Sequence, residues 1–204
     1  MDIFWIWLSE LPYVGPVTSI FSNPKRIYEA EEHELKAIKR LSKRALASIL
    51  THRSLDKSKR RLEQIERKNI KLLRYDDSRY PQHAKRIKHA PVLLYYIGHI
   101  ASFSEAVAVV GSRRCTNYGK AVAVELAGKL AEHGVPTISG MAKGIDSYAQ
   151  TACLQNDGYT IAFVASGVDI CYPKDHRALY EQICERGAVI SEYPPGARPI
   201  PQRF

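Results

Sequence analysis

Three cationic side chains in the second half of the chain lie where they could bind an anion. Arg113, Lys143 and Lys174 each follow a short apolar run, in turns that also contain glycine or serine. Guanidinium and ammonium groups neutralise phosphate, and glycine lets backbone amides approach it closely. These turns show no nucleophile paired with a base. The residue types therefore predict an anion-binding site without catalytic residues.

The apolar runs before these turns are typical of buried parallel strands that alternate with helices. They cover residues 106–110, 136–138, 160–164 and 188–190. Right-handed crossovers would place the turns that follow them at one edge of the sheet, where open α/β folds bind ligands. We therefore expect an α/β fold with a mostly parallel sheet and flanking helices.

The turns supply the candidate binding residues, which are glycines, serines and cations. They are Gly111, Ser112, Arg113, Ser139, Gly140, Lys143, Gly144 and Lys174. The chain lacks both the Gly-x-Gly-x-x-Gly fingerprint and the Walker pattern, so a nicotinamide dehydrogenase and a Walker-type nucleotide site are disfavoured and no cofactor or metal is expected. The alternative for each turn is an ordinary tight turn with a surface cation.

Three further residues near these turns have local interpretations. Asp146 is expected in the first turn of a helix, where the helix dipole favours a carboxylate, and Asp175 is expected to cap the next helix. Tyr172, which precedes a proline, either packs against the protein or stacks on a nucleic-acid base.

Residues 1–69 predict a small all-helical domain, and residues 70–204 predict the α/β domain. Apolar periodicity indicates helices over residues 35–50 and 54–68, and Asn23-Pro24 predicts the start of an earlier helix. The Pro12-x-x-Gly15 turn either connects two helices or belongs to a helix-hairpin-helix module. Residues 70–75 and 91–98 read as strands that join the sheet.

The charge of the chain is unevenly distributed. The net charge of +9 lies in residues 1–100, which hold 20 basic and 11 acidic residues, whereas residues 101–204 hold 10 of each. A basic half indicates either attraction to nucleic acid or a solvated helical face. The four cysteines form no metal-binding pattern and the apolar N-terminus is too short to cross a bilayer, so we expect a cytoplasmic protein with no membrane association.

Several of these segments together resemble the DNA-processing protein A family, also called DprA or Smf. The resemblance rests on Gly111-Ser112-Arg113 with Tyr118-Gly119, on residues 139–146, on Gly167-Val168-Asp169 with Tyr172-Pro173, and on residues 190–194. It covers roughly residues 70–204. The helical N-terminus resembles the family's more variable SAM-like or helix-hairpin-helix domain.

The resemblance implies an extended Rossmann-like fold that dimerises and binds single-stranded DNA in a basic pocket. It also implies a recombination mediator that loads the RecA recombinase during natural transformation, without being an enzyme. By motif position, Arg113 and Lys143 would bind phosphate, with Lys174 as a further candidate.

Two departures from the family and one alternative remain. The family continues into an Arg-Asn-Arg motif, whereas this sequence ends at Phe204, so we expect a chain truncated before that motif. A common family histidine is replaced by Gln150. The alternative function is that of a LOG-like nucleotide phosphoribohydrolase, although its Pro-Gly-Gly-x-Gly-Thr motif is not found here.

Overall fold

The computed structural model describes residues 2–14, 23–38, 41–87 and 90–203. The chain divides into two compact units, Met1–Leu94 and Tyr95–Phe204, which we describe separately. In the described part of the chain, no helix has the length and apolarity needed to span a membrane.

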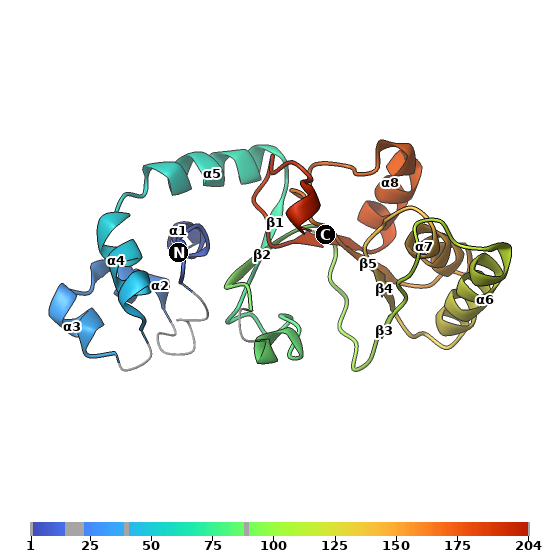
Figure 1. Cartoon of the computed structure of the whole chain (residues 1–204), viewed down its shortest axis with the longest axis horizontal. Coiled ribbons are helices and arrows are strands. Elements are labelled where there is room, and N and C mark those ends of the chain that lie inside the picture. The colour runs from blue at the N-terminus through green and yellow to red at the C-terminus, as the bar shows by residue number, and fades with distance from the viewer. Residues whose placement is uncertain (1, 15–22, 39–40, 88–89, 204) are drawn as a thin grey trace. The chain divides into compact units, whose positions relative to one another are not determined.

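The first unit begins with helices and continues into the sheet (Figure 1). Its elements are α1 (Asp2–Ser9), α2 (Pro24–Glu29), α3 (Glu32–Lys36), α4 (Lys43–Thr51), α5 (Asp56–Arg67), β1 (Lys71–Arg74) and the 3-10 helix η2 (Ala84–Arg86). Helix α1 forms part of the core, because Trp5, Ile6 and Leu8 are buried. The indole of Trp7 donates a hydrogen bond to the carbonyl oxygen of His52 at 2.7 Å.

In the first unit, local signals predict one helix start correctly and miss another. The side chain of Asn23 accepts a hydrogen bond from the amide of Lys25, and Pro24 opens α2, as expected. The prediction of a continuous helix over residues 35–50 is wrong, because α3 and α4 are separate. Ser42 is extended and its hydroxyl accepts a hydrogen bond from the Ala45 amide, which starts a new helix there. Gly15 of the Pro12-x-x-Gly15 turn lies outside the described residues.

The second unit alternates strands and helices, as the apolar runs predict. Its elements are β3 (Val107–Ala108), α6 (Asn117–Glu132), β4 (Thr137–Ser139), α7 (Ile145–Gln155), β5 (Thr160–Phe163), the 3-10 helix η3 (Lys174–His176), α8 (Arg177–Arg186), β6 (Ala188–Ser191) and the 3-10 helix η4 (Pro201–Arg203), while β2 (Leu93–Gly98) crosses the unit boundary. The sheet order is β1-β2-β6-β5-β4-β3. Strands β3, β4, β5 and β6 are parallel, and β2 pairs with β6 in the antiparallel sense.

This arrangement confirms the expected α/β class with a mostly parallel sheet. The predicted domain boundary between residues 69 and 70 falls between the last helix of the N-terminal region, α5, and the first strand, β1. The two compact units of the structure instead divide between Leu94 and Tyr95. The expected domain limits therefore stay a prediction.

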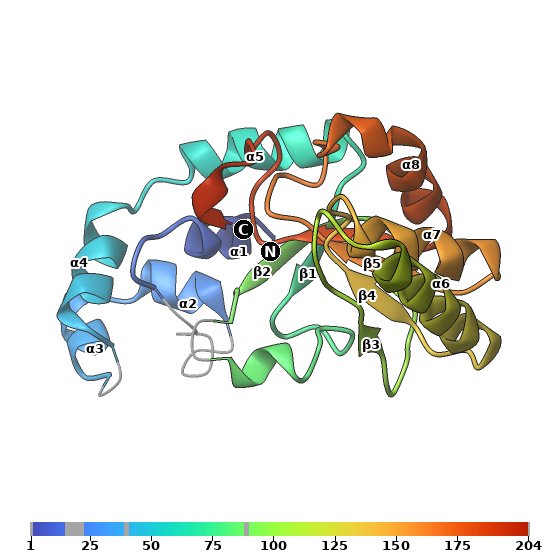
Figure 2. The same ribbon diagram turned by 45° about the vertical axis from the view of Figure 1, so that its right-hand side comes forward.

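Helices α6, α7 and α8 lie side by side on one face of the parallel strands (Figures 1 and 2). Small side chains allow α6 and α7 to pack closely; this core contains Val109, Ala123, Ala127, Ala149, Ala152 and Cys153. Gln150 of α7 is fully buried, and its amide donates to the Thr160 hydroxyl at 3.1 Å and to the Ile161 carbonyl at 3.2 Å. This side chain therefore joins α7 to β5.

Candidate functional site

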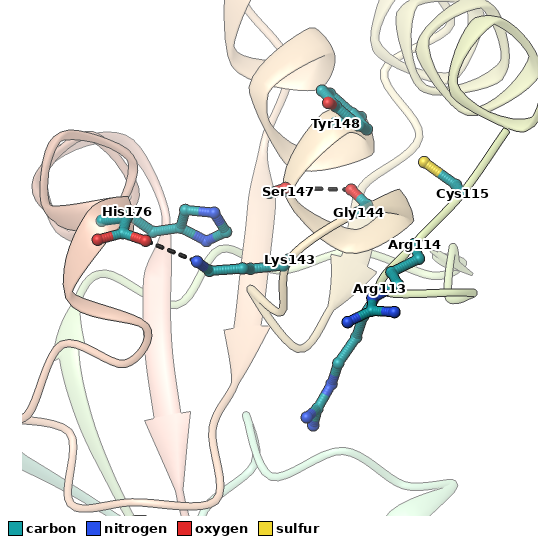
Figure 3. A pocket seen from close by; sticks show the side chains of 9 residues that line it. Arg113, Arg114, Cys115, Lys143, Gly144, Ser147, Tyr148 and His176 are labelled. Atoms are coloured by element: carbon teal, nitrogen blue, oxygen red, sulfur yellow. Dashed lines mark hydrogen bonds and ion pairs between the residues drawn. The ribbon is translucent and has the colours of Figure 1, made fainter. Parts of the chain in front are cut away.

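The turns after β3, β4 and β5 meet at one edge of the sheet, as the crossover rule predicts. They surround an open pocket of about 400 Å³ (Figure 3). Its lining combines cations with a carboxylate, an imidazole, a thiol and an aromatic ring: Arg113, Arg114, Cys115, Lys143, Gly144, Ser147, Tyr148, Asp175 and His176.

Gly144 joins the first two of these turns. A Cβ atom on Gly144 would lie 2.1 Å from the carbonyl oxygen of Ser112, and its φ of +87° is one that side-chain-bearing residues rarely adopt. The same carbonyl accepts a hydrogen bond from the Ile145 amide at 3.3 Å. The turn that carries Arg113 and the turn that carries Lys143 are therefore packed backbone to backbone.

Protein atoms already bind several of the backbone amides expected to meet phosphate. The Gly140 amide donates to the buried Asp146 carboxylate at 3.0 Å, and the amide of Ser147 donates to the Ala142 carbonyl at 3.2 Å. The Ile145 amide is also bonded to the protein, through the Ser112 carbonyl. These three amides therefore shape the turns, and the expectation that backbone amides of this segment bind phosphate stays a prediction.

Asp146 lies in the first turn of α7, as expected from the helix dipole, but it also closes the loop before the helix through Gly140. Ser139 is buried, and its hydroxyl donates to the carbonyl oxygen of Val109 at 2.6 Å. That hydrogen bond joins β4 to the end of β3. Ser139 and Gly140 thus hold the turns in place and do not line the pocket.

Three cations face the pocket, and Lys143 forms an ion pair with the lining residue Asp175. Arg113 and Arg114 come from the turn after β3, and Lys143 comes from the turn after β4 (Figure 3). The Lys143 Nζ atom lies 2.6 Å from the Oδ2 atom of Asp175, which approaches from η3. This hydrogen bond and the attraction between the charges raise the pKa of Lys143 and lower the pKa of Asp175.

His176 ties the third turn to the second. Its Nδ1 atom lies 3.0 Å from the carbonyl oxygen of Met141, so a proton on Nδ1 completes a hydrogen bond there. With Nδ1 used in this way, Nε2 is left for the pocket side, where Figure 3 places the ring beside Lys143. Met141 itself is buried and has a φ of +55°.

An aromatic ring stands at the α7 side of the pocket. Tyr148 projects from the first turns of α7, and the Nζ atom of Lys120 lies 4.6 Å from the centre of its ring. Lys120 thus adds a fourth positive charge close to the pocket lining. A ring with a cation on one face suits contact with a sugar or base on its other side.

The pocket brings together three of the eight predicted binding residues, namely Arg113, Lys143 and Gly144. Lys174 is exposed on η3 outside the lining. Gly111 packs against Ile145, because a Cβ atom there would lie 2.7 Å from the Ile145 side chain. The Ser112 hydroxyl accepts a hydrogen bond from the Arg114 amide at 3.1 Å.

The predicted role of Asp175 as a helix cap is wrong. Helix α8 begins at Arg177 with His176 at its N-cap position and has no side-chain cap hydrogen bond, because η3 intervenes. Asp175 turns instead toward Lys143. Tyr172 is 44% exposed, so its ring remains accessible and its role as a stacking residue stays a prediction.

Sequence reasoning named no pocket role for Tyr148, Asp175 or His176. A weak signal existed for the last two, because they directly follow the predicted cation Lys174. The sequence contains no comparable signal for Tyr148, since a tyrosine at helical spacing more often packs in a core.

Comparison with known proteins identifies the family. Residues 71–204 match the family model described as DNA recombination-mediator protein A. The chain is 39% identical over 167 residues to the putative DNA processing protein DprA of Mycobacterium tuberculosis, covering 74% of this chain and 43% of that protein. It is 32% identical over 206 residues to the protein Smf of Synechocystis, covering 96% and 52% respectively. The chain thus spans about half the length of these relatives.

The fold is also similar to solved structures, of which two are compared with this chain. DNA processing protein A from Streptococcus pneumoniae superimposes with a TM-score of 0.77 at 27% identity, covering 100% of this chain and 70% of that one. The Helicobacter pylori protein, studied for its single-stranded DNA binding mode, gives a TM-score of 0.60 at 30% identity, covering 66% and 60%.

Proposed function

Because this chain belongs to the DNA recombination-mediator protein A family, we propose that it binds single-stranded DNA through the pocket formed by Arg113, Arg114 and Lys143. Single-stranded DNA binding is the subject of the similar Helicobacter pylori structure. Gly111, Ser112, Ser139, Gly140 and Gly144 act in this proposal by shaping the turns, and Lys174 extends the cationic surface beside the pocket.

One observation carries the proposal: cations from two turns, 30 residues apart in the sequence, gather around one open pocket. Like charges that are close together repel each other, and a polyanion that binds between them relieves this repulsion, so a lining that gathers three cations suits a polyanion. The open shape admits a continuous strand, whereas an enclosed cavity would favour a small molecule.

The hydrogen bonds of the polar side chains in the pocket also favour binding over catalysis. Lys143 is held by Asp175, His176 is anchored by the Met141 carbonyl, and the Ser147 hydroxyl donates to the Gly144 carbonyl at 3.0 Å. Ser147 is thus bonded to a backbone acceptor and not to a general base. We propose a protein that holds DNA without cleaving or modifying it.

The wider role follows from the family resemblance. In this proposal the protein acts in the cytoplasm as a homodimer, loads RecA onto incoming single strands and supports recombination during natural transformation.

A titration of fluorescent oligothymidine tests the DNA-binding proposal. Affinity should fall steeply with salt, because each phosphate contact releases counterions. Arg113→Ala and Lys143→Ala should each weaken binding about 5- to 20-fold at low salt, in line with about 1 to 2 kcal/mol for one charged contact.

Lys129→Ala provides a matched control. Lys129 is also an exposed lysine in an ion pair, with Glu125 at 2.6 Å, but it lies twelve residues beyond the start of α6, roughly 18 Å along the helix axis. Its loss should change affinity less than about twofold. Equal behaviour of the three variants would refute binding at this pocket.

A further inference from the structure

One of the side chains that line the pocket, Asp175, is itself negatively charged. The Asp175 carboxylate lies 2.6 Å from the Lys143 ammonium group, and the two side chains are 72% and 57% exposed. Figure 3 shows this ion pair as the dashed line that ends at Lys143. A phosphate that approaches Lys143 therefore meets a carboxylate that already occupies the same ammonium group.

The local backbone does not explain why an acidic residue is at position 175. It does not cap α8, which lacks a side-chain cap hydrogen bond. Among the residues that the structure describes, Lys143 is the hydrogen-bond partner of its side chain. An ion pair this exposed contributes little to folding stability. The position of Asp175 thus has its main consequence in the pocket.

The geometry of the two turns keeps the pair together. Lys143 precedes Gly144, whose backbone packs against Ser112, and Asp175 precedes His176, whose imidazole lies 3.0 Å from the Met141 carbonyl. The carboxylate is therefore held near the ammonium group by the fold, and it remains close after the ion pair opens. A bound phosphate would experience repulsion from it as well as competition.

We propose, on the basis of the DNA-binding function inferred above, that Asp175 is a built-in competitor for phosphate. In the structure its carboxylate neutralises Lys143, and a DNA phosphate binds Lys143 by displacing that carboxylate. Arg113 and Arg114 line the same pocket and add to its attraction for the strand. Asp175 thereby lowers the affinity for DNA and sets how strongly that affinity depends on salt.

Removal of the charge tests this proposal. Asp175→Asn keeps the shape of the side chain and should tighten binding of an oligothymidine of about 20 nucleotides by roughly two- to fivefold at low salt. The salt dependence should become steeper by up to about 0.7 in the slope of log K against log salt, because in the parent protein the displaced carboxylate takes up a salt cation and offsets part of the counterion release.

Asp157→Asn is the matched control. Asp157 is also an exposed aspartate in an ion pair, with Arg186 at 2.8 Å, and its φ of +55° is well tolerated by asparagine. It changes the net charge equally but lies at the other end of α7, after Gln155. Its affinity should stay within about twofold of the parent protein, as expected for a surface charge.

A double variant tests the link to Lys143. With Lys143→Ala in place, Asp175→Asn should no longer tighten binding. The proposal is overturned if Asp175→Asn weakens or fails to change affinity, if Asp157→Asn gives the same gain, or if the gain persists without Lys143. Failure of the DNA-binding proposal looks different: there, Arg113→Ala and Lys143→Ala themselves leave affinity unchanged.

Discussion

The backbone amide of Gly140 donates a hydrogen bond to the carboxylate of Asp146 across the loop between β4 and α7. This carboxylate is only 6% exposed, so it closes the loop in a place that water barely reaches. The loop that carries Lys143 is therefore shaped by a buried acidic residue that is not among those lining the pocket.

Asp146→Ala should destabilise the protein. The substitution removes a charged acceptor and leaves the Gly140 amide without its partner, which costs about 1.5 to 3 kcal/mol of unfolding free energy. Urea denaturation measures this change. Glu185→Ala, at an exposed position of α8, should cost less than about 0.5 kcal/mol. Similar losses for both variants would mean that the Asp146 hydrogen bond has no special structural role.

Gly144→Ala should be more damaging than a glycine substitution elsewhere. A side chain at position 144 combines an unfavourable φ of +87° with a contact of 2.1 Å to the Ser112 carbonyl, so we expect a loss of about 3 kcal/mol or more. Gly134→Ala is the control, because its φ is +67° but nothing lies within 4 Å of the added Cβ atom. That change should cost about 1 to 2 kcal/mol. Equal losses would contradict the close packing of the two turns.

The Lys143–Asp175 pair should be visible in the titration of Asp175. Lys143 lowers the pKa of this carboxyl group, so the pair favours the folded state above the ordinary aspartate pKa of about 3.9 and this contribution is lost as pH falls through the lowered pKa. Carboxyl-carbon NMR should find a higher pKa for Asp175 in Lys143→Ala than in the parent protein. Lys129→Ala should leave the Asp175 titration unchanged and instead raise the pKa of Glu125.

Tyr180 should make the protein sensitive to alkali. Burial raises the pKa of Tyr180, and its hydroxyl donates to the carbonyl oxygen of Val168 at 2.6 Å. Its contribution to stability is complete below the unfolded tyrosine pKa of about 10 and declines as pH rises above that value. Tyr180→Phe should lose about 1 to 2 kcal/mol at pH 7 but show a shallower decline between about pH 10 and 11. Parallel stability curves for the two proteins would contradict this assignment.

The strands and their order of appearance could be predicted because each apolar run is followed by a turn of glycine and serine. The start of α2 could also be predicted, since Asn23 and Pro24 act within one helical turn. Local patterns failed where the same residue could lie inside a helix or start a new one. Ser42 interrupts an apolar periodicity that reads as a single helix, and the hydroxyl of this residue starts a new one.

The contents of the pocket were predictable only in part. Arg113 and Lys143 follow strands, and strand ends meet at one edge of a parallel sheet. The partner of Asp175 lies 32 residues away in sequence, and the partner of His176 lies 35 residues away, so no local pattern reports them. Which backbone amides between β4 and α7 are bonded to other protein atoms depends on the backbone angles of Met141 and Gly144, and residue types alone do not determine these angles.

Contacts within the protein connect the three turns in series. Ile145 is bonded to Ser112, and His176 lies within hydrogen-bonding distance of Met141. Such a chain of contacts restricts each turn through its neighbour, so the cations are carried on a backbone that the fold has already ordered. The entropic cost of ordering these turns is therefore met during folding, and an anion that binds there would have only the side chains left to immobilise.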